Sequence, residues 1–238
     1  MNNFAKPLTI IFLPMIFLLT SCFNDEDPGP LQSDERTYSI VDFDRLEIGS
    51  AMIITVEQGN FFSVQVRGDR RNLNDLDVFK DGNTLVARFD EQGNRSHDTY
   101  ITITMPLLRS ANFSGASNSK VSGFSLNDDR FGLYLSGASV CQLNGDFGEM
   151  KLVVSGASVF TLTGTGDELD AELSGASLLN AFDYDVDAAN VEASGASKAK
   201  VSVNKELYAE ASGASIIAYH GDPSVISNTS GGSSVIKD

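Results

Sequence analysis

The side chains best suited to chemistry in this 238-residue chain are few and widely spaced. The two cysteines are Cys22 and Cys141, and the two histidines are His97 and His220. A zinc site needs several His or Cys ligands at set spacing, and neither histidine has such neighbours. The Gly-x-Ser-x-Gly pattern that surrounds a nucleophilic serine is also absent from the sequence. We therefore predict no catalytic residue, no metal site and no cofactor.

Carboxylates are abundant and raise the alternative of calcium binding or glycan hydrolysis. Asp183, Asp185 and Asp187 alternate along the chain, so on a strand all three face one way. Calcium takes six to eight converging oxygens, which is more than a single row of carboxylates supplies. We therefore interpret this segment as a solvated acidic turn, and expect a non-enzymatic protein.

The net charge of the chain argues against a nucleic-acid partner. The chain has 17 Lys and Arg against 32 Asp and Glu, a formal net charge of −15. Binding to phosphate backbones depends on clustered basic residues, so we expect no nucleic-acid partner. The hydrophobic content of 42% is ordinary for a protein that buries a core.

The N-terminus has the pattern of a bacterial lipoprotein signal. Residues 8–19 are almost continuously apolar, but this run is too short to span a bilayer. It is followed by Leu19-Thr20-Ser21-Cys22, which resembles a lipobox, the cleavage site whose cysteine receives diacylglycerol. We predict a signal peptide over residues 1–21 and lipidation of Cys22, with fatty acyl chains such as palmitate holding the protein to the membrane. The alternative is an ordinary secretory signal with an incidental cysteine.

Residues 22–36 are expected to form an acidic, extended tether between the lipid and the folded domain. Acidic residues directly after the lipidated cysteine resemble the signal that exports some Gram-negative lipoproteins to the outer face of the outer membrane. We therefore expect a lipid-anchored protein of the bacterial outer membrane, exposed at the cell surface. A solvated spacer without export information is the alternative. Since Cys22 is acylated in this scheme, Cys141 has no disulfide partner.

A tetrapeptide repeat dominates the second half of the chain. Ser-Gly-Ala-Ser recurs at intervals of 18–22 residues, and a Ser-Gly-Gly-Ser variant follows at the end. We expect its glycine to adopt positive φ or to allow close approach of neighbouring coils, and its alanine to fit a narrow corner. The serine hydroxyls are expected to satisfy turn backbone groups. The motifs begin at Ser114, Ser136, Ser155, Ser174, Ser194, Ser212 and Ser230.

Apolar and polar residues alternate on both sides of each tetrapeptide, which is typical of half-buried strands. Cys141, Phe160 and Leu179 share one inward position, so we interpret Cys141 as a core residue. A coil this short cannot bury its own apolar face, whereas stacked coils can. The repeats therefore predict an all-β parallel β-helix, or β-solenoid, with coils of about 18–22 residues. A sandwich of antiparallel hairpins is the alternative.

The outward positions predict further features along the stack. Glu172, Glu192 and Glu210 are expected to form an exposed acidic column, while Lys198 and Lys200 belong to a different outward face. Aliphatic residues recur directly after the tetrapeptide. They form an apolar interaction patch unless the N-terminal strands or a second layer cover them. These aliphatic residues are Val140, Val159, Leu178 and Ile216.

Residues 37–110 lack the tetrapeptide but contain further strands, and they carry a resemblance to a known family. The carrying features are Phe43-x-x-Leu46-x-Ile48-Gly49-Ser50, Gln58-Gly59, Asp81-Gly82-x-x-Leu85, and Met105-Pro106 before the first repeat. Over residues 38–236 the chain resembles the head GIN domain proteins, the putative auto-transporter adhesins. The resemblance implies a β-helical domain over residues 37–238, with irregular strands at 37–110 and repeats at 111–238, and a cell-envelope setting.

Together these features predict a lipid-anchored, non-enzymatic β-solenoid that serves as an adhesin or surface-interaction module. Its partners are the membrane, through the lipid on Cys22, and a glycan, a protein ligand or a second copy of itself. One alternative is a periplasm-facing structural or assembly protein. The other is a glycan-active β-helix enzyme, which would need a groove with converging Asp and Arg side chains.

Overall fold

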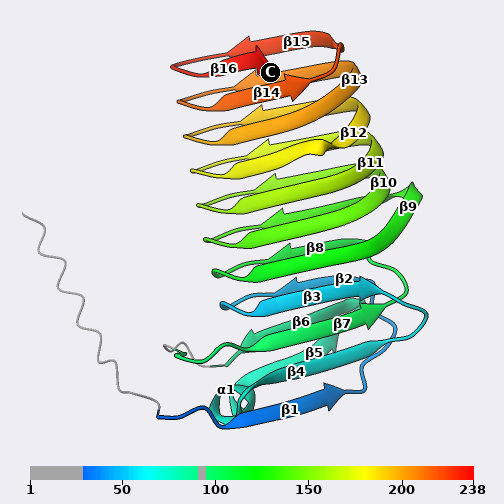
Figure 1. Cartoon of the computed structure of the whole chain (residues 1–238), viewed down its shortest axis with the longest axis vertical. Helices are drawn as coiled ribbons and strands as arrows, with labels where there is room; N and C mark the ends of the chain where they lie inside the picture. The colour runs from blue at the N-terminus through cyan, green and yellow to red at the C-terminus, as the bar shows by residue number, and fades with distance from the viewer. Residues whose placement is uncertain (1–28, 91–94) are drawn as a thin grey trace, which may run out of the picture.

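The computed structural model describes residues 29–90 and 95–238, so the predicted signal peptide and Cys22 lie outside the described residues. Within these ranges the chain is almost entirely β-strand, with one short helix, α1 (Arg70–Asn74). The strands wind into a stack of flattened parallel coils, which confirms the predicted β-solenoid (Figure 1). No helix of the described part is long and apolar enough to cross a membrane.

Five long strands form the body of the stack. Each runs along one broad face, bends around a rounded edge and returns along the opposite face (Figure 1). Neighbouring coils pair in parallel, so that Val140 lies opposite Val159 on the first face and Met150 opposite Leu169 on the second. We call these the front face and the back face. The strands are β9 (Asn118–Leu135), β10 (Val140–Val154), β11 (Val159–Leu173), β12 (Leu178–Ala193) and β13 (Lys198–Ala211).

The Ser-Gly-Ala-Ser tetrapeptides close the coils along the narrow edge. The Ala176 N–H donates to the Gly156 carbonyl at 2.7 Å, so the turns themselves continue the hydrogen-bonded ladder. Gly156 has φ +76°, a conformation that L-residues rarely adopt. A Cβ placed on it would lie 2.3 Å from the carbonyl oxygen of Gly137 in the preceding turn. Both expected roles of the glycine, positive φ and close approach, are therefore confirmed.

The last serine of each tetrapeptide, rather than the alanine, occupies the narrow corner of the turn. Ala157 and Ala176 are exposed on the edge, so the prediction that the alanine occupies a narrow corner is wrong. The last serine fills that position instead, since Ser158 and Ser177 are buried. The Ser177 hydroxyl donates to the Ser174 carbonyl at 2.7 Å, as expected for a hydroxyl that satisfies the turn backbone.

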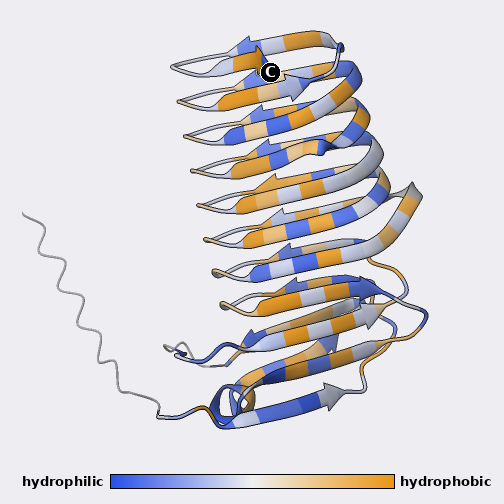
Figure 2. Ribbon diagram, viewed as in Figure 1, coloured by the Kyte–Doolittle hydropathy of each residue, from blue (hydrophilic) through white to orange (hydrophobic). Residues whose placement is uncertain are grey.

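One hydrophobic core runs through the stack. The alternation of hydrophobic and hydrophilic residues along each strand is visible in Figure 2, and the hydrophobic residues point between the two faces. Burying a large aliphatic or aromatic side chain contributes about 1.5–3 kcal/mol, which is why coils that are marginal alone are stable when stacked. One inward column consists of Cys141, Phe160, Leu179, Ala199 and Ile217, all 0% exposed.

The first third of the chain also forms parallel coils, but their spatial order differs from their chain order. The coil of β2 and β3 lies between the coil of β6 and β7 and the coil of β8 and β9. A hairpin partner, β5, pairs antiparallel with β6. The bounds are β2 (Arg45–Ile48), β3 (Ile53–Gln58), β5 (Leu76–Asp81), β6 (Thr84–Phe89), β7 (Tyr100–Met105) and β8 (Ser110–Phe113).

The two ends of the stack are built differently. At the N-terminal end β1 (Ser33–Tyr38) pairs antiparallel with β4 (Ser63–Asp69), β4 pairs antiparallel with β7, and α1 lies beside β1 and β4. The opposite end consists of β14 (Ile216–His220), β15 (Ser224–Thr229) and β16 (Ser234–Lys237), which continue the parallel pairing. This last coil leaves Val225, Ile226 and Ile236 exposed.

Candidate interaction surfaces

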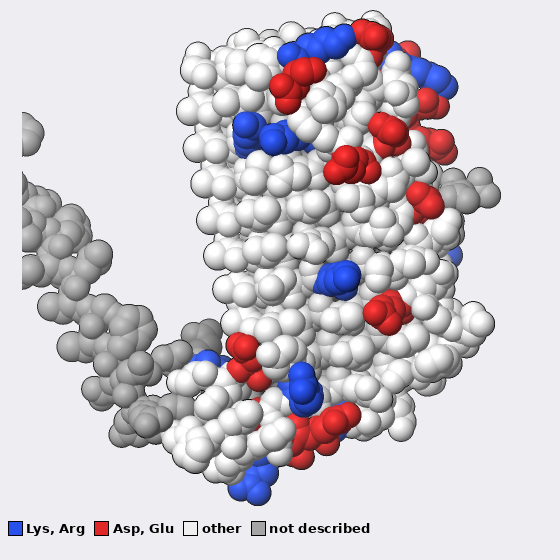
Figure 3. Space-filling model, in the orientation of Figure 1, with Lys and Arg blue, Asp and Glu red and all other residues white. Residues whose placement is uncertain are grey.

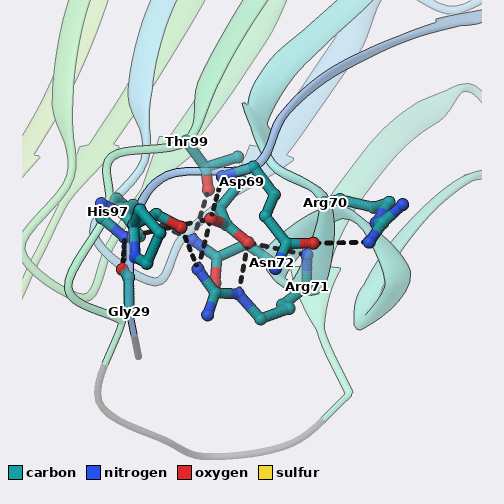
Figure 4. Close-up of polar contacts among 9 residues, drawn as sticks. Gly29, Asp69, Arg70, Arg71, Asn72, His97 and Thr99 are labelled. Atoms are coloured by element: carbon teal, nitrogen blue, oxygen red, sulfur yellow. Dashed lines mark hydrogen bonds and ion pairs between the residues drawn. The ribbon is translucent and has the colours of Figure 1, made fainter. Parts of the chain in front are cut away.

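A cluster of polar contacts around Asp69 holds the N-terminal segment against the base of the stack (Figure 4). Asp69 ends β4, caps α1 and is only 1% exposed. Its carboxylate accepts hydrogen bonds from Arg71 at 2.6 and 2.7 Å, from the Arg71 N–H at 2.9 Å and from the Gln32 N–H at 2.9 Å. These donors, the Arg71 guanidinium first, hold the pKa of the Asp69 carboxyl far below its usual range.

The same cluster fixes residues 29–32, the start of the described chain. The Arg71 guanidinium donates to the Pro30 carbonyl at 3.2 Å, and the Arg70 N–H donates to the Gln32 carbonyl at 2.8 Å. A His97 ring nitrogen lies 3.1 Å from the Gly29 carbonyl. These contacts fix the point at which the chain leaves the base toward its N-terminus. We call Gln32, Asp69, Arg71 and His97 the anchor cluster.

The structure keeps the two histidines and the described cysteine apart. His97 belongs to the anchor cluster, whereas the His220 ring stacks on Phe182 with ring centroids 3.8 Å apart, far along the chain on the C-terminal coils. Cys141 lies in the core, and burial raises its thiol pKa to about 12. In the described ranges no group of three or more His, Cys, Asp or Glu is arranged to hold a metal ion.

The acidic triplet lies where β12 bends around the rounded edge. Asp183 and Asp185 are exposed while Tyr184 points into the core, so the expected alternation is confirmed. Two of the carboxylates, Asp185 and Asp187, are engaged by neighbouring side chains, and with Asp167 they line a hollow of about 350 Å³. Asp185 accepts a hydrogen bond from Ser202 at 2.7 Å, and Asp187 pairs with Lys205 at 2.7 Å.

The back face carries the expected acidic column. Glu172 lies opposite Glu192, and Glu192 opposite Glu210, on three successive coils. They line a shallow groove of about 300 Å³, whose remaining walls include the first serines of the tetrapeptides. Lys151 donates to Glu172 at 2.9 Å, and Tyr208 to Glu210 at 2.7 Å. The back face is therefore acidic, with one lysine paired to its lower end.

The front face is less acidic. From β9 to β14 its strands carry Lys120, Lys198 and Lys200, and two exposed carboxylates lie in the neighbouring column, where Glu57 of β3 is opposite Ser122 and Asp183 of β12 is opposite Thr163. In Figure 3 the middle of this face is white, with blue lysine or arginine atoms below and above it and red Asp or Glu atoms beside them toward the rounded edge. The prediction that Lys198 and Lys200 lie on a different face from the glutamates is confirmed by their positions on β13.

Two columns of side chains run along the front face between these lysines. The first, which we call the front column, consists of Lys120, Gln142, Thr161, Asn180 and Lys200, each opposite the next across neighbouring strands. The second, the aliphatic column, consists of Val140, Val159 and Leu178. Val140 is 38% exposed and the other two are half-buried. The N-terminal strands extend this sheet and do not cover the aliphatic column.

Sequence reasoning missed Lys120, although the repeat contains a signal for it. Lys120 is the third residue after Ser117, as Lys200 is the third residue after Ser197. Aligning the repeats on the tetrapeptide therefore places both lysines in the same column. Sequence reasoning also missed the anchor cluster, which joins residues about 40 and 65 positions apart and leaves no periodic trace.

A hollow of about 370 Å³ at the base combines Asp and Arg side chains, as expected of the groove of a glycan-active enzyme. Its lining includes Arg67, His97, Asp98 and Tyr100. The Arg67 guanidinium lies 4.8 Å from the Tyr100 ring centroid, and the Tyr100 hydroxyl donates to Asp98 at 3.3 Å. Only one carboxylate lines this hollow, whereas a glycoside hydrolase of the common type uses a pair.

Comparison with known proteins agrees with this architecture. Residues 42–223 match the model of a family described as "Putative auto-transporter adhesin, head GIN domain", which confirms the resemblance expected from the sequence. No curated protein matches the chain.

Solved structures share the fold. A putative adhesin from Bacteroides fragilis NCTC 9343 has a TM-score of 0.82 and 18% identity, covering 87% of this chain and 97% of that chain. A putative adhesin from Parabacteroides distasonis ATCC 8503 has a TM-score of 0.69 and 18% identity, covering 88% and 98%. A putative lipid binding protein from the same strain has a TM-score of 0.68 and 19% identity, covering 87% and 96%.

Proposed function

The chain belongs to the head GIN domain family of putative auto-transporter adhesins, and we propose that it is a lipid-anchored, non-enzymatic interaction module of the bacterial outer membrane. In this proposal fatty acyl chains on Cys22 hold the protein at the cell surface. The stack of coils then presents its broad faces to a ligand. The observation that carries the proposal is the uniform stack itself, whose coils from β10 to β13 are closed by the same four-residue turn without insertions.

The anchored end supports this arrangement. The anchor cluster holds residues 29–32 on the base, only seven residues after the predicted lipidation site at Cys22. A short tether that enters one end of a stiff stack keeps that end near the membrane and directs the other end away. The front and back faces then stand roughly along the direction away from the membrane and remain accessible to partners.

The chemistry of the faces supports a binding role over a catalytic one. Cys141 is buried with a raised pKa, so its thiol is neither accessible nor ionised near neutral pH. At the rounded edge Asp185 is hydrogen-bonded to Ser202 and Asp187 is paired with Lys205, and the glutamates of the back face form one row. Side chains arranged in columns can contact an extended ligand along its length, whereas catalysis needs groups gathered around one bond.

A periplasm-facing assembly protein is the second candidate, and the last coil favours it. Val225, Ile226 and Ile236 are exposed there, and exposed apolar residues on an edge strand favour association with another chain. In that case the protein would self-associate through β15 and β16 and would face the periplasm.

Protease shaving of intact cells separates the two candidates. We expect externally added protease to remove the wild-type protein from cells whose outer membrane is intact, and a periplasmic marker to survive. A Cys22→Ala variant is the unanchored control and should leave the membrane fraction. Protection of the wild-type protein until the outer membrane is breached would contradict surface display and favour the periplasmic candidate.

A further inference from the structure

We propose that the front face binds a linear acidic polysaccharide, laid along the stack over the front column and the aliphatic column. This inference rests on the proposed surface-interaction function and names the ligand class for it. Lys120 and Lys200 contact acidic groups at the two ends of the bound segment. Gln142, Thr161 and Asn180 donate to or accept from its hydroxyl groups between them.

Charge is the first argument. The chain carries a net charge of −15, and Lys151, Lys205 and Lys237 are each paired with a carboxylate. In the ranges that the structure describes, Lys120, Lys198 and Lys200 form no ion pair, and all three lie on the front face. Glu57 and Asp183 lie beside the two ends of the front column, but the column itself carries no carboxylate between Lys120 and Lys200, so its lysines attract an anionic partner.

The repeat of the columns is the second argument. Lys120 and Lys200 are four coils apart, and coils in a parallel sheet are about 4.8 Å apart, so the front column is about 19 Å long. Each intervening coil offers one amide or hydroxyl group at the same position. A 1,4-linked hexose chain rises by nearly the coil spacing per sugar, so each sugar of a chain laid along the stack lies over one coil.

The aliphatic column completes the match. Val140, Val159 and Leu178 lie directly beside the front column and form a flat apolar strip. A pyranose ring has an apolar face of C–H groups and a rim of hydroxyls. A chain of such rings places its apolar faces on the strip while its hydroxyls reach Gln142, Thr161 and Asn180.

Two other occupants fit the face less well. The acidic column of a second copy spans three successive coils and is about 10 Å long. It is therefore too short to contact both Lys120 and Lys200 of the front column. A lipid surface must attract the whole acidic body through three lysines, and each basic residue adds only a small attraction.

Binding of an octamer of 1,4-linked galacturonic acid to the full-length protein, purified in mild detergent, tests the proposal. We expect Lys120→Gln and Lys200→Gln each to weaken binding about fivefold, the effect of losing one exposed ion pair. Thr161→Asp, which places a carboxylate in the middle of the column, should weaken it about tenfold or more. The neutral malto-octaose should bind more weakly than the acidic octamer.

Lys151→Gln is the matched control, because it removes the same charge from the back face. Its binding should equal that of the wild type, and thermal melting should show that every variant is folded. Equal weakening by Lys151→Gln and Lys120→Gln, equal binding of the neutral octamer, or no binding of the acidic octamer would each overturn the inference. Loss of self-association or of binding to anionic vesicles in the front-face variants, without loss of saccharide binding, would assign the face to the other occupants.

The two proposals fail in different ways. If the octamer does not bind but protease removes the protein from intact cells, the surface function stands and the ligand class is wrong. If the octamer binds but the protein is protected in intact cells, the front face is a saccharide site on a periplasmic protein.

Discussion

The base of the molecule, residues 29–105, and the stack above it, residues 110–238, share one strand geometry but are stabilised in different ways. In the stack the same turn recurs, and a backbone N–H of each turn donates a hydrogen bond to a carbonyl of the preceding turn. The strands of the base are stacked in an order that differs from their order in the sequence. They are held by antiparallel pairs, by a hairpin and by the buried Asp69 carboxylate.

In the stack, the residues that stabilise the fold are different from the residues that determine the chemistry of the surface. A coil held by its turn, its ladder and its inward column leaves the outward residues free to change. The front face and the back face of the same strands accordingly carry opposite charge, with Lys120 and Lys200 on one and Glu172 and Glu192 on the other. In the base, by contrast, polar side chains such as Asp69 and Arg71 are structural.

The largest expected effect is in a turn of the stack. Gly156→Ala should lower the free energy of unfolding by about 3 kcal/mol, because a left-handed conformation costs an L-residue about 1–2 kcal/mol and the displaced neighbour adds more. The added Cβ would lie 2.3 Å from the Gly137 carbonyl oxygen, which belongs to the backbone and cannot rotate away. Chemical denaturation of the purified variant measures the change.

Gly82→Ala in the base measures how much of the lost unfolding free energy comes from backbone conformation alone. Gly82 has φ +56° in the turn between β5 and β6, and a Cβ there would meet nothing within 4 Å. We expect a cost of about 1 kcal/mol, the conformational cost alone. Equal losses at Gly82 and Gly156 would show that close contact between turns does not limit the stack.

The second prediction concerns the anchor cluster. Asp69→Asn should lower the free energy of unfolding by about 2 kcal/mol at pH 7, since hydrogen bonds to a charged, buried acceptor are lost. Arg71 is 38% exposed and regains water, which limits the loss. Denaturant titration at pH 7 measures the effect, and limited proteolysis should show earlier cleavage near residues 29–32.

The pH dependence of this difference follows from the Asp69 pKa. The folded-state pKa is far below the unfolded value of about 3.9, so the ionised carboxylate stabilises the protein fully above pH 4. That contribution decreases as the pH falls from about 4 toward the folded-state pKa. The gap between wild type and Asp69→Asn should therefore be smaller at pH 3 than at pH 7. Asp222→Asn, at an exposed pair with Lys237, is the control and should leave stability unchanged at both pH values.

The stack was predictable because its sequence repeats. The spacing of the tetrapeptide implied stacked coils, and the inward column of Cys141, Phe160 and Leu179 followed from aligning the repeats. The position of β2 and β3 between later coils was not predictable in this way. It depends on pairing between segments separated by about 40–65 residues, and strands of alternating apolar residues are compatible with several neighbours.

The candidate surfaces were predictable to a similar extent. Glu172, Glu192 and Glu210 were placed together from the sequence, since they share one repeat position. The absence of ion pairs at the front-face lysines was not predictable, because it depends on distances between side chains on neighbouring coils, such as Lys120 and Glu57. The anchor cluster was hidden for a related reason: Gln32, Asp69 and His97 are brought together only by antiparallel pairing at the base.

The smallest expected effect tests how uniform the stack is. Ser177 and Ser158 occupy the same buried position in successive tetrapeptides, but their hydroxyls differ. The Ser177 hydroxyl donates to the Ser174 carbonyl, whereas the Ser158 hydroxyl has no hydrogen-bond partner in the described structure. Ser177→Ala should therefore cost about 1 kcal/mol, the usual worth of a buried hydrogen bond. Ser158→Ala removes an unsatisfied polar group and should be neutral or slightly stabilising. Thermal melting of the two single variants compares them directly, and equal destabilisation would mean that the turns are energetically equivalent.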